Sequence, residues 1–219
     1  MTTRNQKIKP AASRVQATEP EQAIDSSPVE LGFVIDRSES MKYLRDELIN
    51  AFNTVLTEQA APNVLASLAL FGTETDIIAD RIPVQAIRPL NHSSYRPEGY
   101  TALLDGIGTM IFLMERQGTS SRKLVAIFTD GHENASTSFD LEQIIGAIAE
   151  RQERGWQFIF VTPREGIEYG VRLGIPREHV VEFDASVDGL KSIMGRLSRT
   201  VKAYRLGDSE YAQQLQLEA

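Results

Sequence analysis

The chain has 219 residues, 42% of them hydrophobic and 24% charged, a composition typical of one globular domain with tails. Its formal net charge of −7 argues against nucleic acid as a main partner, because nucleic-acid binding relies on clustered Lys and Arg side chains. The sequence contains no cysteine, which excludes disulfides, thiolate metal sites and cysteine nucleophiles.

The first 28 residues are rich in small and polar residues and have few large apolar side chains, so we predict a flexible N-terminal tail over residues 1–28. This segment has no apolar run of signal-peptide length, and no stretch elsewhere reaches the roughly 18 apolar residues of a membrane span. We therefore predict a cytoplasmic protein without a membrane span. Its folded domain is expected over residues 29–205, followed by a polar C-terminal tail over residues 206–219.

Strand-like apolar runs alternate with helical spacing along this domain. The first run, LGFVID at Leu31–Asp36, is apolar up to a single carboxylate, as expected for a buried parallel strand that ends at a loop. The patterns then predict, in chain order, a helix with Ser40 as its N-cap, strands at Val64–Phe71 and Thr75–Val84, a helix at Thr101–Gln117, a strand at Leu124–Gly131, a helix around Leu141–Ile148, a strand at Phe158–Val161, a short helix at Ile167–Leu173, a strand at Val180–Phe183 and a helix at Val187–Tyr204.

Strands that alternate with helices imply an α/β fold, in which right-handed crossovers place helices on both faces of a doubly wound, mostly parallel sheet. The hairpin formed by residues 64–84 adds one antiparallel strand, and Pro83 favours an edge position for it. In such sheets ligands bind beyond the carboxyl ends of the strands, where the winding order reverses. The site is therefore expected there.

Oxygen-bearing side chains gather at the ends of the two long apolar strands. Asp36, Ser38 and Ser40 follow the first strand at alternate positions, Asp130 ends the later strand in the motif FTDG, and Thr101 opens a helix in GYTALLDGI. If the two strands are neighbours, both carboxylates face one crevice and Thr101 enters it from the helix start. A hard divalent cation such as Mg²⁺ prefers about six oxygen ligands, which suits this set.

The segments FVIDRSESM, GYTALLDGI and IFTDGHEN resemble, in order and spacing, the metal-ion-dependent adhesion site (MIDAS) of von Willebrand factor type A (vWA) domains. The resemblance covers about residues 30 to 205 and implies a Rossmann-like vWA fold. It implies that Ser38, Ser40 and Thr101 are metal ligands through their hydroxyls, and that Asp36 and Asp130 bind directly or through water.

The resemblance also implies a function. Sites of this family commonly bind an acidic side chain of a partner protein at an open coordination position of the metal, with no chemical step. We therefore expect a non-enzymatic protein-binding module that holds Mg²⁺, Mn²⁺ or Ca²⁺, and that recognises a carboxylate of a protein partner.

The rim of this site is expected to include Arg37, Tyr100, His132 and Glu133. Tyr100 departs from the family pattern, which often has a small residue such as Gly before the helix-opening Thr. Its ring could contact a partner, narrow access to the metal, or be a half-buried loop aromatic. Asp105, one helical turn after Thr101, is interpreted as a structural hydrogen-bonding residue rather than a sixth ligand.

Two other functions remain open at the level of the sequence. A Mg²⁺-dependent phosphohydrolase of doubly wound fold would also place an Asp at the end of the first strand, but it predicts an acid or base where Ser38 stands, and no Lys or His motif completes a phosphate site. A structural subunit with a vestigial metal site is the other alternative.

Overall fold

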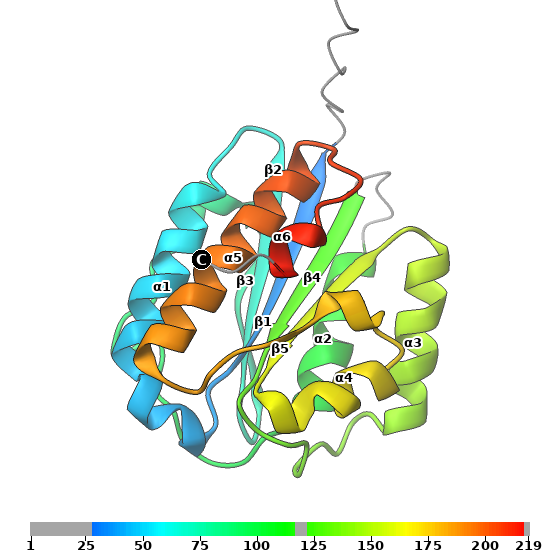
Figure 1. Cartoon of the computed structure of the whole chain (residues 1–219). Helices are drawn as coiled ribbons and strands as arrows, with labels where there is room; N and C mark the ends of the chain where they lie inside the picture. Colours follow the sequence, from blue (N-terminus) through cyan, green and yellow to red (C-terminus); the bar gives the residue numbers. More distant parts are fainter. Residues whose placement is uncertain (1–27, 117–121, 217–219) are drawn as a thin grey trace, which may run out of the picture.

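A six-stranded sheet forms the centre of the computed structural model, which describes residues 28–116 and 122–216 (Figure 1). The strands are β1 (Val29–Asp36), β2 (Val64–Phe71), β3 (Thr75–Pro83), β4 (Arg122–Phe128), β5 (Gln157–Thr162) and β6 (Val180–Glu182). They lie in the order β3-β2-β1-β4-β5-β6, and every neighbouring pair is parallel except β2 and β3. This confirms the doubly wound α/β fold with one antiparallel edge strand.

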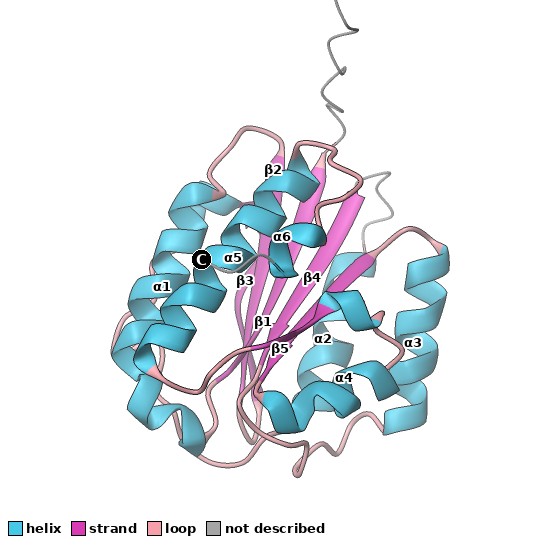
Figure 2. Cartoon of the chain, viewed as in Figure 1, coloured by secondary structure: helices cyan, strands magenta, loops and turns pink. Residues whose placement is uncertain are grey.

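Helices cover both faces of the sheet (Figure 2). The α-helices are α1 (Arg45–Glu58), α2 (Leu103–Glu115), α3 (Leu141–Glu153), α4 (Ile167–Arg172), α5 (Val187–Arg205) and α6 (Gln213–Gln216), and short 3₁₀ helices are η1 (Glu39–Leu44), η2 (Val84–Ala86), η3 (Arg164–Gly166) and η4 (Arg177–His179). The buried side chains of α1, α5 and α6 belong to one apolar core, and those of α2, α3 and α4 belong to a second core on the other face.

The two cores meet at the central strand β1, because its successive side chains point to opposite faces of the sheet. Phe33 packs edge-on against Phe52 of α1, with ring centroids 5.2 Å apart. On the other face α2 lies close to the backbone at Gly32, where an added Cβ would come within 2.6 Å of the Met114 sulfur. A larger residue at this position would force the Met114 side chain to move.

The helix predicted to begin at Ser40 starts differently. A six-residue 3₁₀ helix, η1, spans Glu39–Leu44 before α1 begins at Arg45, and the residue that precedes η1 is Ser38. Ser40 is therefore not an N-cap. Its hydroxyl is hydrogen-bonded to other side chains instead of to helix N–H groups, which is the physical reason for the difference.

The C-terminal segment predicted as a polar tail beyond residue 205 is part of the folded domain as far as residue 216. Leu215 is fully buried and Tyr211 is nearly so. The Tyr211 hydroxyl donates to Oε1 of Gln157 (2.8 Å), and the Arg196 guanidinium donates to the Leu215 carbonyl (3.0 Å). At the other end Pro28 already accepts a hydrogen bond from the N–H of Arg122. Residues 1–27 and 217–219 of the predicted tails lie outside the described residues.

None of the helices in the described part of the chain is both long and apolar enough to cross a membrane.

Candidate metal site

The sheet topology places the ends of β1 and β4 side by side. The two strands are parallel neighbours, and Ile35 pairs with Phe128, so Asp36 and the residues after Phe128 leave the sheet at the same edge. The chain runs from β1 outward to β2 and β3, and then returns to β4 on the other side of β1. This edge is the point where the winding order reverses, as predicted for the site.

Hydrogen bonds connect four of the five predicted metal-binding residues. Asp36 is fully buried, and its Oδ1 accepts the N–H of Ser38 at 2.6 Å. The hydroxyls of Ser38 and Ser40 are hydrogen-bonded at 3.1 Å, and Ser40 donates to Oδ1 of Asp130 at 2.7 Å. Side-chain oxygens thus link Ser38, Ser40 and Asp130, and the backbone of Ser38 connects them to Asp36.

The fifth residue, Thr101, joins this group through the loop before α2. Its side chain is buried, and its N–H donates to Oδ1 of Asn134 at 2.9 Å. A Cβ placed on Gly131 would lie 3.1 Å from Oγ1 of Thr101 and 3.8 Å from Oδ2 of Asp36. The Thr101 hydroxyl and the Asp36 carboxylate therefore both lie next to Gly131.

The electrostatics of the site suit a cation. Burial raises the pKa of Asp36 from its ordinary value of 3.8 to about 6, although hydrogen bonds from Ser38 and Thr129 partly oppose this shift, and repulsion from Asp130 adds to it. Burial also raises the pKa of Asp130, against the hydrogen bond from Ser40. Both carboxylates thus sit where a negative charge is poorly solvated, and a bound cation would offset that cost.

The donor set fits a hard divalent ion. In the part of the chain that the structure describes, no three His, Cys, Asp or Glu side chains gather as a metal site. The candidate site accordingly has only two carboxylates, and its other oxygens come from three hydroxyls. Oxygen donors of this kind suit Mg²⁺, Mn²⁺ or Ca²⁺ better than a soft metal.

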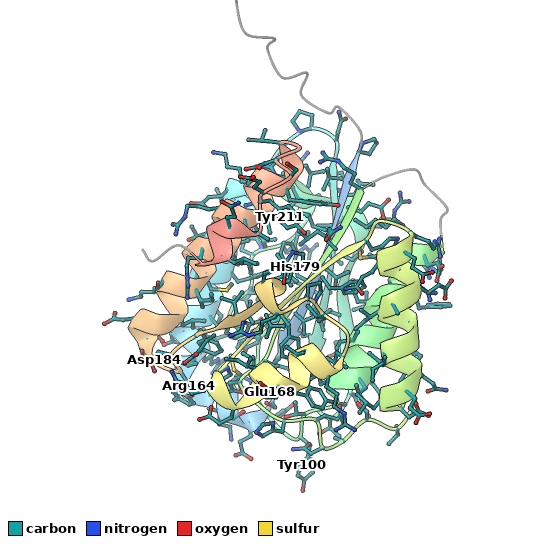
Figure 3. The ribbon with its side chains drawn as sticks, turned by 45° about the vertical axis from the view of Figure 1, so that its right-hand side comes forward. Tyr100, Arg164, Glu168, His179, Asp184 and Tyr211 are labelled. Carbon is teal, nitrogen blue, oxygen red and sulfur yellow. The ribbon has the colours of Figure 1, made fainter. Side chains whose placement is uncertain are left out.

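Two of the predicted rim residues, Tyr100 and His132, are exposed beside members of this cluster, and a third, Arg37, turns away from it. Tyr100 is 68% exposed, and Figure 3 shows its side chain projecting away from the body of the protein. His132 is exposed and lines a hollow beside Asp130. The Arg37 guanidinium turns to the other side, where it forms an ion pair with Asp76 of β3 at 2.8 Å.

Glu133 differs from the expectation of a rim residue. Its carboxylate accepts hydrogen bonds from the N–H groups of Leu104, Ala135 and Ser136 and from the Ser136 hydroxyl, at 2.7–2.9 Å. A carboxylate at the start of a helix is favoured by the unpaired N–H groups there. Glu133 therefore ties its loop to the beginning of α2 instead of presenting its charge to a partner.

Two residues that support the site were missed by the sequence reasoning. The Thr129 hydroxyl donates to Oδ2 of Asp36 at 2.6 Å, and the buried Tyr95 hydroxyl donates to the Asp36 carbonyl at 2.7 Å. Thr129 could have been suspected, because it directly precedes Asp130 at the end of a buried strand. Tyr95 stands in an irregular stretch, where no pattern points to it.

Asp105 has the structural role predicted for it. Its two carboxylate oxygens accept the N–H groups of Thr137, Ser138 and Phe139, each at 3.0 Å, and so hold the loop that follows the site. We expect Asp105→Ala to lower the free energy of unfolding by about 2–3 kcal/mol, because three backbone donors lose a charged acceptor. Asp105→Asn keeps one acceptor oxygen and should cost less. Urea denaturation of the two variants measures the difference, and equal stability of Asp105→Ala and wild type would contradict this role.

The sequence matches no protein-family model and no curated protein. Solved structures, in contrast, resemble the chain at low sequence identity. The PilB minor pilin from Streptococcus sanguinis superimposes with a TM-score of 0.63 at 14% identity, over 87% of this chain and 64% of that one. The pilus adhesin SpaC from Lactobacillus rhamnosus GG gives 0.63 at 13% identity, over 87% of this chain and 31% of that one. The chain thus spans less than two thirds of either protein.

The structure of an isolated VWA domain matches this chain over nearly the whole length of that domain. The SpRpn10 VWA domain superimposes with a TM-score of 0.56 at 10% identity, over 78% of this chain and 95% of that domain. These identities are too low to establish more than the fold. Together with the strand order and the helices on both faces of the sheet, they show that this chain has the Rossmann-like fold of vWA domains.

Proposed function

We propose that this protein is a divalent-metal-dependent binding module, which holds Mg²⁺ or a similar ion with Asp36, Ser38, Ser40, Thr101 and Asp130 and recognises a carboxylate of a protein partner. The observation that carries the proposal is the convergence of these five oxygen-bearing side chains at the switch point of the sheet. Two similar structures support the metal: the mussel proximal thread matrix protein 1 with a zinc-occupied MIDAS motif (TM-score 0.60, 16% identity) and the manganese-loaded Plasmodium vivax TRAP protein (0.56, 18%).

The balance of charges explains why such a site would bind a partner. Three of the five side chains are neutral hydroxyls, so the two carboxylates at most neutralise a divalent ion. When bound, the ion supplies an electrophilic position to which an external carboxylate can coordinate. The residues of this chain orient that position: Thr129 and the Ser38 N–H fix the Asp36 carboxylate, and Ser40 fixes Asp130.

The residue types at the site favour binding over phosphoester hydrolysis. A phosphohydrolase that uses Asp36 as its nucleophile needs a general acid or base close to it in the site. The residue two positions later, Ser38, cannot act as the general acid or base. We therefore propose that the protein is not an enzyme. The cytoplasmic location remains a prediction from the sequence.

The relaxation of water protons by Mn²⁺ tests the proposal directly. We expect Mn²⁺ to bind the protein and to enhance relaxation, because an open coordination position holds exchangeable water on a slowly tumbling complex. Blocked aspartate, N-acetyl-aspartate N-methylamide, should then reduce the enhancement by displacing that water, and the corresponding blocked asparagine should not.

Thr101→Val is the variant that tests the proposed ligands, because it removes one hydroxyl and keeps the shape of a buried side chain. It should weaken Mn²⁺ binding about ten-fold or more. Failure of Mn²⁺ to bind, or binding that Thr101→Val leaves unchanged, would contradict the proposed site. Release of p-nitrophenol from p-nitrophenyl phosphate, lost in the variant, would instead favour the phosphohydrolase alternative.

A further inference from the structure

A hollow opens beside the candidate metal site, at the carboxyl ends of β4 and β5. Asp130 and Gly131 line the side next to the metal site, and Thr162, Glu165 and Gly166 line the side next to β5 and η3. Its volume is about 240 Å³, below the roughly 300–1,000 Å³ of sites that enclose a small molecule. The hollow therefore suits a single side chain of a larger partner.

Thr162 supplies a buried polar group to this hollow. Its side chain is 1% exposed, and its hydroxyl has no hydrogen-bonding partner among residues 28–116 and 122–216. The order Thr162-Pro163-Arg164-Glu165 has the spacing of a helix-capping box, yet no side chain caps η3. Because Thr162 lines the hollow, a ligand that occupies the hollow can hydrogen-bond to this hydroxyl.

A glycine keeps the Thr162 hydroxyl open to the hollow. A Cβ on Gly166 would come within 2.0 Å of Oγ1 of Thr162, a separation that no real side chain tolerates. Any other residue at position 166 would thus displace the hydroxyl or close this side of the hollow.

The charges around the hollow indicate the kind of side chain that fits. Asp130 and Glu165 both line it, and the exposed Glu165 carboxylate forms no ion pair with another residue of the described chain. The adjacent cation, Arg164, is paired with Glu182 at 3.1 Å. Two carboxylates and a hydroxyl oxygen are acceptors that match a cationic group whose N–H groups can only donate. Glu165 keeps the hollow negative even when a metal compensates Asp130.

We propose that this hollow receives a Lys or Arg side chain of the same partner that offers its carboxylate to the metal. The inference rests on the proposed function, since Asp130 lines the hollow and also belongs to the metal site. It identifies the partner surface by its chemistry: an acidic residue with a basic residue close to it. The aliphatic stem would fill the hollow, and the charged end would bind Glu165 and the Thr162 hydroxyl.

A titration with n-butylammonium chloride tests the hollow itself, with n-butanol as the neutral probe of similar size. The measurement is the amide NMR shift of Gly131 and Gly166 in protein saturated with Mg²⁺. We expect saturable shifts with n-butylammonium and at least about five-fold weaker binding of n-butanol, because only the ammonium ion matches the charged acceptors.

Matched variants distinguish binding in the hollow from non-specific attraction to negative surface charge. Glu165→Gln and Thr162→Val should each weaken n-butylammonium binding several-fold without changing Mg²⁺ affinity. Glu168→Gln is the control, because it removes an exposed carboxylate on α4 that does not line the hollow. This variant should bind n-butylammonium like wild type. Figure 3 shows Glu168 and Arg164 at the same end of the molecule as Tyr100. Equal affinity for n-butanol, or binding unchanged in Glu165→Gln, would overturn the inference.

Measuring Mg²⁺ binding separately distinguishes a failure of the proposed metal site from a failure of the proposed hollow. If Mg²⁺ binds but n-butylammonium does not, the inference fails and the proposed function stands. If Mg²⁺ does not bind, the proposed function fails, and the titration of the metal-free protein then decides whether the hollow selects a cation.

Discussion

Replacing Asp36 with Asn is expected to abolish the rise in Tm that Mg²⁺ produces in the wild-type protein. At a Mg²⁺ concentration 100 times its Kd, binding to the native state adds about 2.7 kcal/mol to the free energy of unfolding. For a domain of this size that corresponds to a rise in Tm of about 5–10 °C. Asp36→Asn lacks the central carboxylate, so its Tm should stay constant across the same Mg²⁺ titration.

The same variant should be more stable than wild type in the absence of metal at pH 7.5. Burial raises the pKa of Asp36 from 3.8 to about 6, so the folded protein holds an ionised carboxylate there at a cost of up to about 3 kcal/mol. An Asn fits the same hydrogen bonds: its oxygen accepts the Ser38 N–H, and its amide donates to the Thr129 hydroxyl, which then donates to the Gly131 carbonyl 3.2 Å away.

The direction of the pH effect follows from the raised pKa. As the pH falls from about 6 toward 3.8, the folded state takes up the Asp36 proton before the unfolded state does, so the contribution of Asp36 to the stability of the metal-free protein rises. Mg²⁺ binding should weaken over the same range, because the metal competes with that proton. Asp36→Asn should show neither change.

Asp208→Asn is the matched control for this experiment, because Asp208 is exposed and belongs to the C-terminal segment. It should retain both the Mg²⁺-induced rise in Tm and the pH dependence of wild type. A full rise in Tm in Asp36→Asn would show that Mg²⁺ binds elsewhere and would remove the basis of the proposed site.

Much of the fold could be predicted because hydrophobic periodicity reports burial directly. The run LGFVID has no polar residue before Asp36, and a strand buried on both faces needs such a run. The alternation of strands and helices then restricts the topology to a few arrangements, and the position of the oxygen cluster follows from the rule for strand ends.

The hydrogen-bond partners of individual side chains could not be predicted from the sequence. Ser40 has the residue type of an N-cap, but its hydroxyl binds Asp130, which is 90 positions away in the chain. Glu133 follows the site in sequence, but the free N–H of Leu104 draws its carboxylate inward. In both cases the side chain has two chemically suitable partners, and only the tertiary structure decides between them.

The packing of the C-terminal segment is hard to predict for a related reason. Residues 206–219 mix hydrophobic with polar residues and are too short for a clear hydrophobic period. Tyr211 and Leu215 carry the packing. The Tyr211 ring meets Tyr204 edge-on and His179 at a tilt, with ring centroids 5.1 and 5.6 Å away, and Leu215 is fully buried. A short segment with two buried anchors therefore gives no periodic signal in the sequence.

Leu215→Ala tests whether this segment belongs to the folding unit, and we expect it to lower the free energy of unfolding by about 2–4 kcal/mol in urea denaturation. The side chain joins the core that α5 forms with α1, so its truncation removes buried apolar surface and leaves a cavity. Gln213→Ala, on the exposed side of α6, should change stability by less than about 0.5 kcal/mol. If both variants unfold like wild type, the segment does not belong to the folding unit. Because α6 packs on α5 and η4, which carry none of the five predicted metal-binding residues, Mg²⁺ should raise the Tm of Leu215→Ala as much as that of wild type. This result would separate the stability of the domain from the function of its site.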